Sequence, residues 1–224
     1  MKVSVLGAVL SAILVVPCTA QDAPLKIGPT VVRFDFQRAE LSPPRWGFEV
    51  AEDGQGRYYE NTTVEPAGAP DAPENRWQSV HISAATMALL KAGSARHGDR
   101  CETAAKNIAQ TGKKTLSYWH DDVPWTCEFN YSDDEGVMKT ANAFQAMAET
   151  IQMGEKLAHD HRFDRLSLDA DMQILEESVK AGRAIEVENI AAVLQSVADD
   201  EHVIDRARRR ASRLLQDVGV SASQ

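Results

Sequence analysis

The sequence predicts an α+β fold in which a small antiparallel sheet with one disulfide is followed by an antiparallel bundle of about four helices. Three observations predict it. Short segments between residues 30 and 131 alternate apolar and polar side chains and are separated by turn residues, as strands are. Residues 133–217 instead repeat apolar side chains at helical spacing. Two cysteines, Cys101 and Cys127, follow an apolar N-terminal leader.

The leader, residues 1–20, has the features of a cleavable secretory signal. Its apolar run, residues 3–16, suits a signal-peptide core and is shorter than the roughly 20 residues that cross a bilayer. Cys18 and Ala20 place small side chains where a signal peptidase reads them, which predicts cleavage between Ala20 and Gln21. The alternatives are an N-terminal membrane anchor and a lipid anchor on Cys18. We expect a periplasmic or secreted protein.

Residues 21–131 are predicted to form a β-rich region with two hairpins. Residues 45–51 alternate in character and are followed by Asp53-Gly54 and a second strand near residues 57–60. Asp-Gly between such runs is a strong hairpin signal, because glycine adopts the positive φ of tight turns. Further strands are expected at residues 31–37 and 77–83.

A short helix should follow the last of these strands, from Ala84 to about Lys91. Ser83 is its expected N-cap, and Gly93 is expected to close it.

The second hairpin is predicted from residues 115–120, an Asp121-Asp122-Val123-Pro124 turn and a return strand. The return strand alternates cleanly, with Cys127 on the same face as its aromatic residues. In an oxidising compartment two cysteines most simply form one disulfide, which would stabilise the fold by about 3 kcal/mol. A thiol nucleophile or half of a metal site is the alternative for Cys101 and Cys127.

Residues 132–217 are predicted to be helical, and residues 218–224 to be a disordered tail. Ser132 and Glu135 form a capping box for a helix of roughly 30 residues that ends near Phe163. Its small inward residues should allow neighbouring elements to approach closely. Three more helices are expected around residues 172–182, 187–197 and 203–215, with connections short enough for antiparallel packing. Two arrangements agree with the sequence: this region packs with the β-rich region as one domain, or it forms its own.

Two short sequence segments resemble those of other proteins. Residues 53–58 (Asp-Gly-Gln-Gly-Arg-Tyr) and residues 126–132 (Thr-Cys-Glu-Phe-Asn-Tyr-Ser), followed by a long helix, resemble a group of uncharacterised exported proteins of acidobacteria. The resemblance covers most of the mature chain. It implies a bacterial periplasmic or extracellular setting and no particular activity.

Charge and motif content narrow the function. The chain has a net charge of −9, so nucleic acid and anionic lipid are not expected as general partners. After the leader no apolar run approaches membrane-spanning length, and we expect no cofactor, because glycine-rich phosphate loops are absent from the sequence. The Gly-x-Ser-x-Gly, Ser-x-x-Lys and His-Glu-x-x-His signatures of hydrolases are absent too.

Several clusters have both a chemical and a structural interpretation. His159, Asp160, His161 and Asp164 contain metal-ligand side chains, with Glu155 nearby. Residues two apart on a helix diverge, which favours a solvated polar face. An acidic group around the second hairpin could bind calcium or act as an acid/base pair, although turn and helix-dipole roles explain it better. That group comprises Asp121, Asp122, Asp133, Asp134 and Glu135.

Other candidates are weaker. His81 and His120 are the candidate general bases of a site assembled from distant residues. Aromatic residues of the second hairpin could stack on a sugar, but a core face is the better interpretation. They are Trp119, Trp125, Phe129 and Tyr131. Asn61 and Asn130 begin formal glycosylation acceptors.

One basic strip is predicted on the last helix, opposite its apolar side. It consists of Arg206, Arg209, Arg210 and Arg213. The strip could meet an acidic partner, or it could pair within the chain with Asp205, Glu176 and neighbouring acids. We therefore expect a non-enzymatic binding or scaffolding protein, with a protein partner through the helical half. The alternative is a hydrolase of the cell envelope or exterior whose site is assembled from loops.

Overall fold

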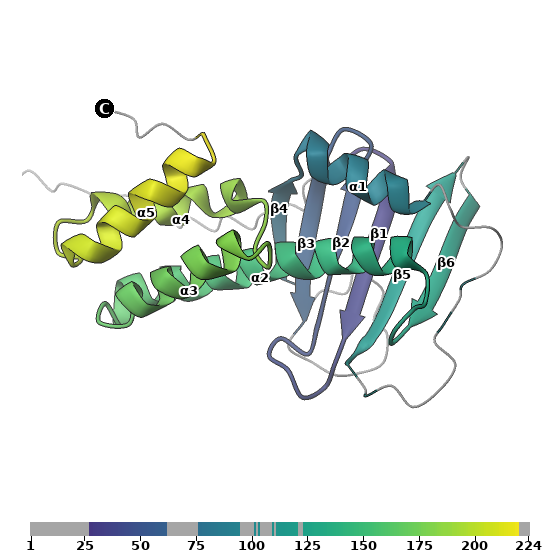
Figure 1. Cartoon of the computed structure of the whole chain (residues 1–224), viewed down its shortest axis with the longest axis horizontal. Helices are drawn as coiled ribbons and strands as arrows, with labels where there is room; N and C mark the ends of the chain where they lie inside the picture. The colour runs from purple at the N-terminus through teal and green to yellow at the C-terminus, as the bar shows by residue number, and fades with distance from the viewer. Residues whose placement is uncertain are drawn as a thin grey trace, which may run out of the picture.

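The computed structural model describes residues 27–61, 76–94, 101, 103, 109, 111–120 and 123–219, and it has the predicted α+β fold (Figure 1). A six-stranded antiparallel sheet is followed by a helical region. Several predicted features lie outside the described residues: the leader with its cleavage site between Ala20 and Gln21, the turn residues Asp121 and Asp122, and residues 220–224 of the tail.

The six strands pair in the order β4-β3-β2-β1-β5-β6, and every neighbouring pair is antiparallel. Both predicted hairpins are present, as β2–β3 and β5–β6. The strands are β1 (Thr30–Gln37), β2 (Arg45–Ala51), β3 (Gln55–Asn61), β4 (Arg76–His81), β5 (Lys113–His120) and β6 (Val123–Phe129).

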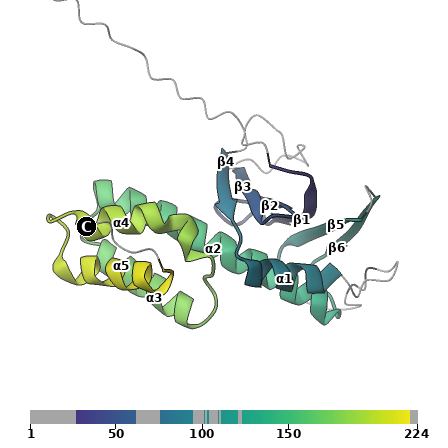
Figure 2. The same ribbon diagram turned by 90° about the horizontal axis from the view of Figure 1, so that it is seen from above.

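One face of the sheet is apolar and is covered by two helices, α1 (Ala84–Ser94) and α2 (Glu135–Phe163) (Figure 2). The strand register places five buried side chains side by side across five strands, namely Tyr58, Phe48, Phe34, Leu116 and Cys127. Phe144 of α2 stacks on Phe34, with ring centroids 5.0 Å apart. The alternation seen in the sequence therefore becomes a continuous core between the sheet and the helices.

The predicted disulfide joins Cys101 to Cys127, with Cα atoms 5.1 Å apart. Cys127 is buried in the sheet core, and Cys101 packs against that core from the segment before β5.

The N-cap of α2 is Asp134, so the prediction that Ser132 caps this helix is wrong. The Asp134 carboxylate accepts hydrogen bonds from the backbone N–H groups of Gly136 (2.7 Å) and Val137 (3.1 Å). Ser132 acts one step earlier: its hydroxyl accepts from the Asp134 N–H at 3.1 Å and shapes the turn that leads into the helix. The carboxylate also suits the positive end of the helix dipole.

Helix α1 continues past Gly93 to Ser94, so Gly93 does not end it as predicted. Gly93 instead faces α2, where a Cβ atom would lie 2.2 Å from Thr140 Oγ1 and 2.8 Å from the Tyr118 hydroxyl. Its role is to let the two helices approach closely. The Ser83 prediction is confirmed, since its hydroxyl accepts from the Thr86 N–H at 3.3 Å.

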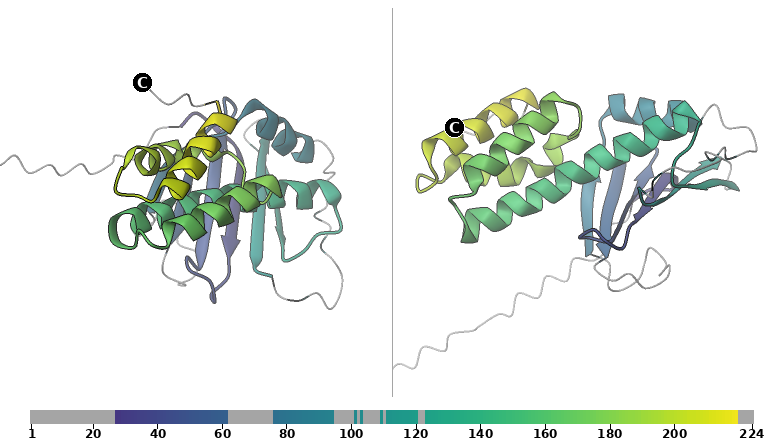
Figure 3. Two further views of the ribbon diagram at one scale, coloured as in Figure 1. Left: turned by 60° about the vertical axis from the view of Figure 1, so that its left-hand side comes forward. Right: turned by 60° about the horizontal axis from the view of Figure 1, so that its bottom comes forward.

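Helix α2 extends beyond the sheet, and its second half packs with a group of helices that lies beside the sheet (Figure 3). These are α3 (Leu168–Lys180), the 3-10 helix η1 (Val187–Ile190), α4 (Ala191–Asp199) and α5 (Asp205–Asp217). Gly182, with φ +67°, follows α3 as predicted. A second apolar cluster fills the space between them and includes Leu157 of α2.

The helical region meets the sheet at its edge strand β4. Asn189 accepts from the His81 N–H (2.7 Å) and donates to the His81 carbonyl (2.9 Å), as a neighbouring strand would. Glu186, with φ +58°, accepts from the Ser83 N–H (3.1 Å) and hydroxyl (2.7 Å). Two polar side chains of the helical region thus hold the end of β4 and the start of α1.

Candidate functional site

The face of the sheet opposite α1 and α2 carries charged side chains near its centre. The register places Arg57 beside Glu49 and Glu49 beside Arg33, on three neighbouring strands. Asp35 follows Arg33 by two residues and therefore lies on the same face. Among the described residues, no helix covers this face.

An alternating network of charges crosses this face. Asp35 accepts from Arg33 through one carboxylate oxygen (3.1 and 3.2 Å) and from Arg45 through the other (2.9 and 3.1 Å). Glu49 accepts from Arg57 at 2.7 Å and lies 3.8 Å from Arg33. Three guanidinium groups thus share two carboxylates, and the network has a net charge of +1. We call it the arginine network.

Burial and neighbouring charge shift the pKa of Arg45 in opposite directions. Burial lowers its pKa, but the charge and hydrogen bonds of Asp35, with a smaller contribution from Tyr59, together raise it by more, so the net pKa is raised. The side chains of Arg45 and Asp35 are only 12% and 17% exposed, which keeps the pair in one orientation. The guanidinium group is therefore a fixed positive charge at the side of the site.

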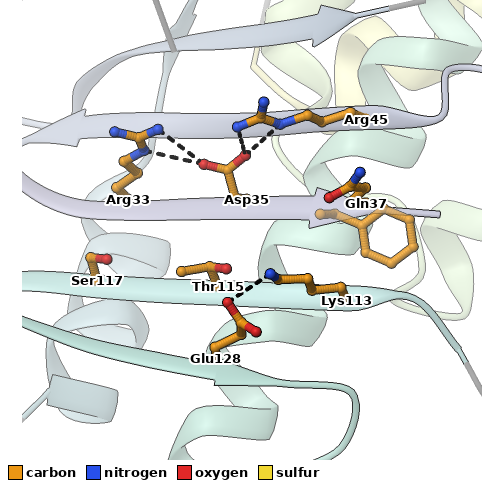
Figure 4. A pocket seen from close by; sticks show the side chains of 9 residues that line it. Arg33, Asp35, Gln37, Arg45, Lys113, Thr115, Ser117 and Glu128 are labelled. Atoms are coloured by element: carbon orange, nitrogen blue, oxygen red, sulfur yellow. Dashed lines mark hydrogen bonds and ion pairs between the residues drawn. The ribbon is translucent and has the colours of Figure 1, made fainter. Parts of the chain in front are cut away.

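A trough lies beside the arginine network, along β5 (Figure 4). Its floor is formed by Thr115 and Ser117, whose side chains are short. Its far wall is the ion pair between Lys113 and Glu128, with Nζ and Oε2 2.8 Å apart. The cavity has a volume of about 330 Å³. Short side chains between two rows of long charged ones create a hollow on an otherwise flat sheet.

The trough offers binding groups and lacks the parts of a nucleophilic site. Ser117 Oγ lies 3.0 Å from Thr126 Oγ1, and the described lining residues include no histidine or cysteine to activate it. The lining does supply guanidinium and ammonium donors, two carboxylate acceptors and two hydroxyls. Such a mixture suits a polar ligand that both donates and accepts hydrogen bonds.

A second cleft, of about 230 Å³, lies where α2 leaves the sheet. Arg76 forms ion pairs with both Glu60 and Glu155, and the Tyr58 hydroxyl accepts from Gln152 at 3.0 Å. Burial, followed by the charge of Glu60, raises the pKa of Glu155. This cleft therefore contains a pair of carboxylates in unequal environments.

A third cleft, of about 410 Å³, contains His81, one of the two predicted general bases. His81 Nδ1 lies 3.4 Å from Gln55 Nε2, and Asp53 uses its carboxylate to accept from the Gln55 N–H at 2.9 Å. No carboxylate hydrogen bond to the His81 ring is formed by the described residues. The side chain of His120, the other predicted base, lies outside them.

The two histidines near the end of α2 point in different directions, as helical spacing predicts. His159 Nδ1 lies 3.2 Å from Asp160 Oδ1, whereas His161 Nε2 lies 2.9 Å from Asp200 Oδ2. Asp164 accepts from the Ser167 hydroxyl at 2.6 Å. In the described part of the chain, no group of three or more His, Cys, Asp or Glu side chains could hold a metal ion.

The predicted basic strip on α5 pairs largely within the chain. Arg206 and Arg210 bind Asp169 of α3, at 2.7 and 3.4 Å. Arg213 binds Glu176 of α3 at 2.9 Å, and Arg210 binds the same carboxylate. Arg209 lies 2.5 Å from Asp205 on its own helix.

The predicted aromatic platform is not assembled. Trp125, Cys127 and Phe129 share the core face, whereas Trp119 pairs with Pro124 on the opposite face. Tyr131 is exposed and lies beyond β6, which ends at Phe129.

The remaining predicted residues have local roles or lie where the chain is not fully described. Glu135 pairs with Lys139 in the first turn of α2, and Asp133 is exposed before the helix. Asn130 accepts from Thr111 N–H at 2.8 Å, so its amide is engaged. Asn61 ends β3, and the rest of its glycosylation acceptor lies outside the described residues.

The helical half exposes large apolar side chains at its far end. Phe163 is 75% exposed and Leu166 is 89% exposed, on either side of the turn between α2 and α3. A protein partner on this half of the molecule stays a prediction. Among the described helices, none is both long enough and apolar enough to cross a membrane.

The trough was not predicted from the sequence, although the alternation of residues 32–36 indicates part of it. Arg33 and Asp35 alternate with Val32, Phe34 and Phe36 in a predicted strand, so their shared face could have been identified. The position of Thr115 and Ser117 beside them depends on β1 pairing with β5, far along the chain, which alternation does not reveal.

Comparison with known proteins does not add to this description: no family model matches the chain, and no curated protein matches it. The resemblance to exported proteins of acidobacteria therefore stays a prediction.

Proposed function

We propose that this chain is a non-enzymatic binding protein of an oxidising compartment outside the cytoplasm, and that the trough on the sheet face opposite α1 and α2 is its ligand site. The observation that carries the proposal is the trough itself: short Thr115 and Ser117 lie between the arginine network and the Lys113–Glu128 pair. The Cys101–Cys127 disulfide agrees with the compartment.

The physical argument is that the binding groups are held in place before a ligand arrives. Backbone groups on β1 and β5 bond each other in the ladder, so the face must recognise its ligand through side chains. Arg33 and Arg45 are oriented by Asp35, which lowers the entropy that binding would otherwise cost.

The test fills the trough without removing a charge. In Thr115→Trp an indole occupies the floor, whereas Ser79→Trp places the same group on the same face at the exposed edge strand β4. Trigalacturonate, maltotriose and hexaglutamate are titrated calorimetrically into both variants and the wild-type protein. We expect at least one probe to bind the wild type and the Ser79→Trp protein, and to lose at least tenfold in affinity with Thr115→Trp. Binding that Thr115→Trp leaves unchanged, or no binding of any probe at millimolar concentration, would contradict the proposal.

A hydrolase remains the second candidate, because the cleft at the end of the sheet contains Glu60 and Glu155. Paired carboxylates of unequal pKa are the acid and base of glycoside hydrolysis. Arg76 forms ion pairs with both carboxylates and lowers the pKa of Glu155, which partly offsets the effect of burial. Turnover of nitrophenyl glycosides by the wild type that Glu155→Gln abolishes would establish this function instead.

A further inference from the structure

We infer that the ligand of the trough is an acidic saccharide, a chain of hydroxyl-rich sugar units that carry carboxylates. The inference rests on the proposed function and names its ligand class. Three features of the trough support it: the positive charge of its arginine network, its mixture of hydrogen-bond donors and acceptors, and an aromatic residue in line with its floor.

The charge of the site is opposite to that of the protein. The chain carries −9 overall, but the arginine network carries one more positive than negative charge, and the Lys113–Glu128 pair beside it is neutral. Arg33 is 24% exposed and turns one edge of its guanidinium group towards Asp35, with NH1 directed towards Glu49 only at 3.8 Å. A carboxylate on the ligand would complete the charge balance, and guanidinium groups match carboxylates in geometry.

The carboxylates and hydroxyls of the trough distinguish a sugar from an acidic peptide. Asp35 and Glu128 can accept hydrogen bonds from sugar hydroxyls, which the side chains of an acidic peptide do not offer. Thr115 and Ser117 add hydroxyls on the floor. A peptide could not add itself as a strand here, because the ladder on both sides of β5 is already complete.

An aromatic side chain continues the row of the floor. Strand alternation places Trp119 on the same face as Thr115 and Ser117, two residues further along β5, and its side chain is partly exposed. A sugar ring stacks on an indole through its apolar C–H face, whereas a free small anion gains nothing from one. Together these groups form a row for an extended saccharide.

The experiment compares trigalacturonate with maltotriose, a neutral sugar of equal length, and with hexaglutamate, an acidic chain without hydroxyls. We expect the wild type to prefer trigalacturonate by about tenfold or more over each. Arg33→Gln should reduce that preference over maltotriose about tenfold, and Trp119→Ala should weaken both sugars together. Raising the salt to 0.5 M should weaken trigalacturonate more than maltotriose.

Lys139→Gln is the matched control, because it removes one positive charge from an exposed ion pair on α2, away from the trough. It should leave all three affinities within twofold. Circular dichroism and the melting temperature show that each variant is folded, and Trp119→Ala tests the inference without touching the ion pairs.

The outcomes separate the two proposals. If Thr115→Trp abolishes binding but maltotriose or hexaglutamate binds as tightly as trigalacturonate, the ligand class is wrong and the site stands. If trigalacturonate binds and Thr115→Trp has no effect, both proposals fail. A preference for trigalacturonate that Lys139→Gln reduces as much as Arg33→Gln would reflect general charge, and it would also overturn the inference.

Discussion

At the level of the residue, two buried carboxylates on neighbouring helices have pKa values that are shifted in opposite directions. Asp160 of α2 and Asp171 of α3 are each 6% exposed, and both bind Lys156, at 2.8 and 2.5 Å. Burial raises the pKa of both groups. For Asp160 the hydrogen bonds from Lys156, Asp171 and His159 outweigh burial and lower the pKa to about 2. The pKa of Asp171 is raised, because burial, together with the hydrogen bond and charge of Asp160, outweighs the opposing effect of Lys156.

The first prediction follows from these opposite shifts. At neutral pH Asp160→Asn should cost about 1–3 kcal/mol of the free energy of unfolding, because it removes a buried charge that several donors satisfy. Asp171→Asn should cost less, because the raised pKa of Asp171 means that the fold does not stabilise its charge as it stabilises that of Asp160. Urea titrations at pH 7 measure both, and an equal or larger loss in Asp171→Asn would contradict the assignment.

The same pair sets a pH dependence. The lowered pKa of Asp160 means that its contribution to stability is complete above the unfolded value near 4 and is lost as the pH falls towards about 2. The raised pKa of Asp171 acts the other way, so its protonation favours the folded state as the pH falls through that raised value. Stability measured from pH 7 to pH 2 should therefore fall less steeply below pH 4 in Asp160→Asn than in the wild type.

At the level of the element, the last helix, α5, forms both buried and exposed ion pairs, which differ in how much they stabilise the fold. Arg210 is 18% exposed and touches two carboxylates of α3, Asp169 and Glu176. Arg209, on the same helix, is 65% exposed and touches only Asp205 among the described residues. The strip that the sequence predicts as one cationic surface thus contains both an interhelical connection and a solvated ion pair. The two Arg210 ion pairs connect α5 to α3 beside the apolar face that packs inward.

The second prediction contrasts these two arginines. Arg210→Gln should lower the free energy of unfolding by about 1–2 kcal/mol, since it leaves Glu176 with fewer partners at 9% exposure. Arg209→Gln removes the same charge and should change the free energy by less than about 0.5 kcal/mol, because exposed pairs are screened by solvent. Thermal or urea unfolding of the two variants checks the difference. Equal effects would mean that net charge, and not the α3–α5 contact, is what matters.

In the whole molecule, two apolar cores are joined by a shared helix and by polar contacts. Helix α2 belongs to both, since Phe144 packs under the sheet and Leu157 packs among the helices. Close approach is possible because Gly154 faces Ile190, where a Cβ atom would lie only 2.3 Å from Cγ2. Asn189 and Glu186 then join the helical region to β4 and α1.

The third prediction concerns this connection. Asn189→Ala removes both hydrogen bonds to the His81 backbone and should destabilise the protein by about 1–2 kcal/mol. Amide hydrogen exchange should rise at β4 and α1 and stay unchanged at β5 and β6, far from the contact. Gln195→Ala is the control, because it removes only a hydrogen bond to Asp199 at a partly exposed position of α4. If exchange rises evenly across the sheet, the two cores unfold as one cooperative unit.

Much of this architecture was accessible from local pattern, because short-range physics sets it. The period of two in residues 45–51 and the Asp53-Gly54 turn define the first hairpin, and the apolar spacing after residue 133 defines the long helix. Helix ends were harder, since Asp134 and Ser132 both fit a cap and only their final distances to the backbone decide between them. The Cys101–Cys127 pairing followed from there being two cysteines after the predicted leader, which contains Cys18.

What the amino-acid sequence alone determined is therefore the elements, the fold class and the disulfide, because alternation, helical spacing and turn chemistry act between near neighbours. Tertiary structure alone decided which strands are adjacent, and so placed Thr115 and Ser117 of β5 beside Arg33 and Asp35 of β1. It also decided that most of the α5 arginines are paired and that Asn189 completes the edge of the sheet. These contacts join residues far apart in the chain, and they depend on how whole faces pack.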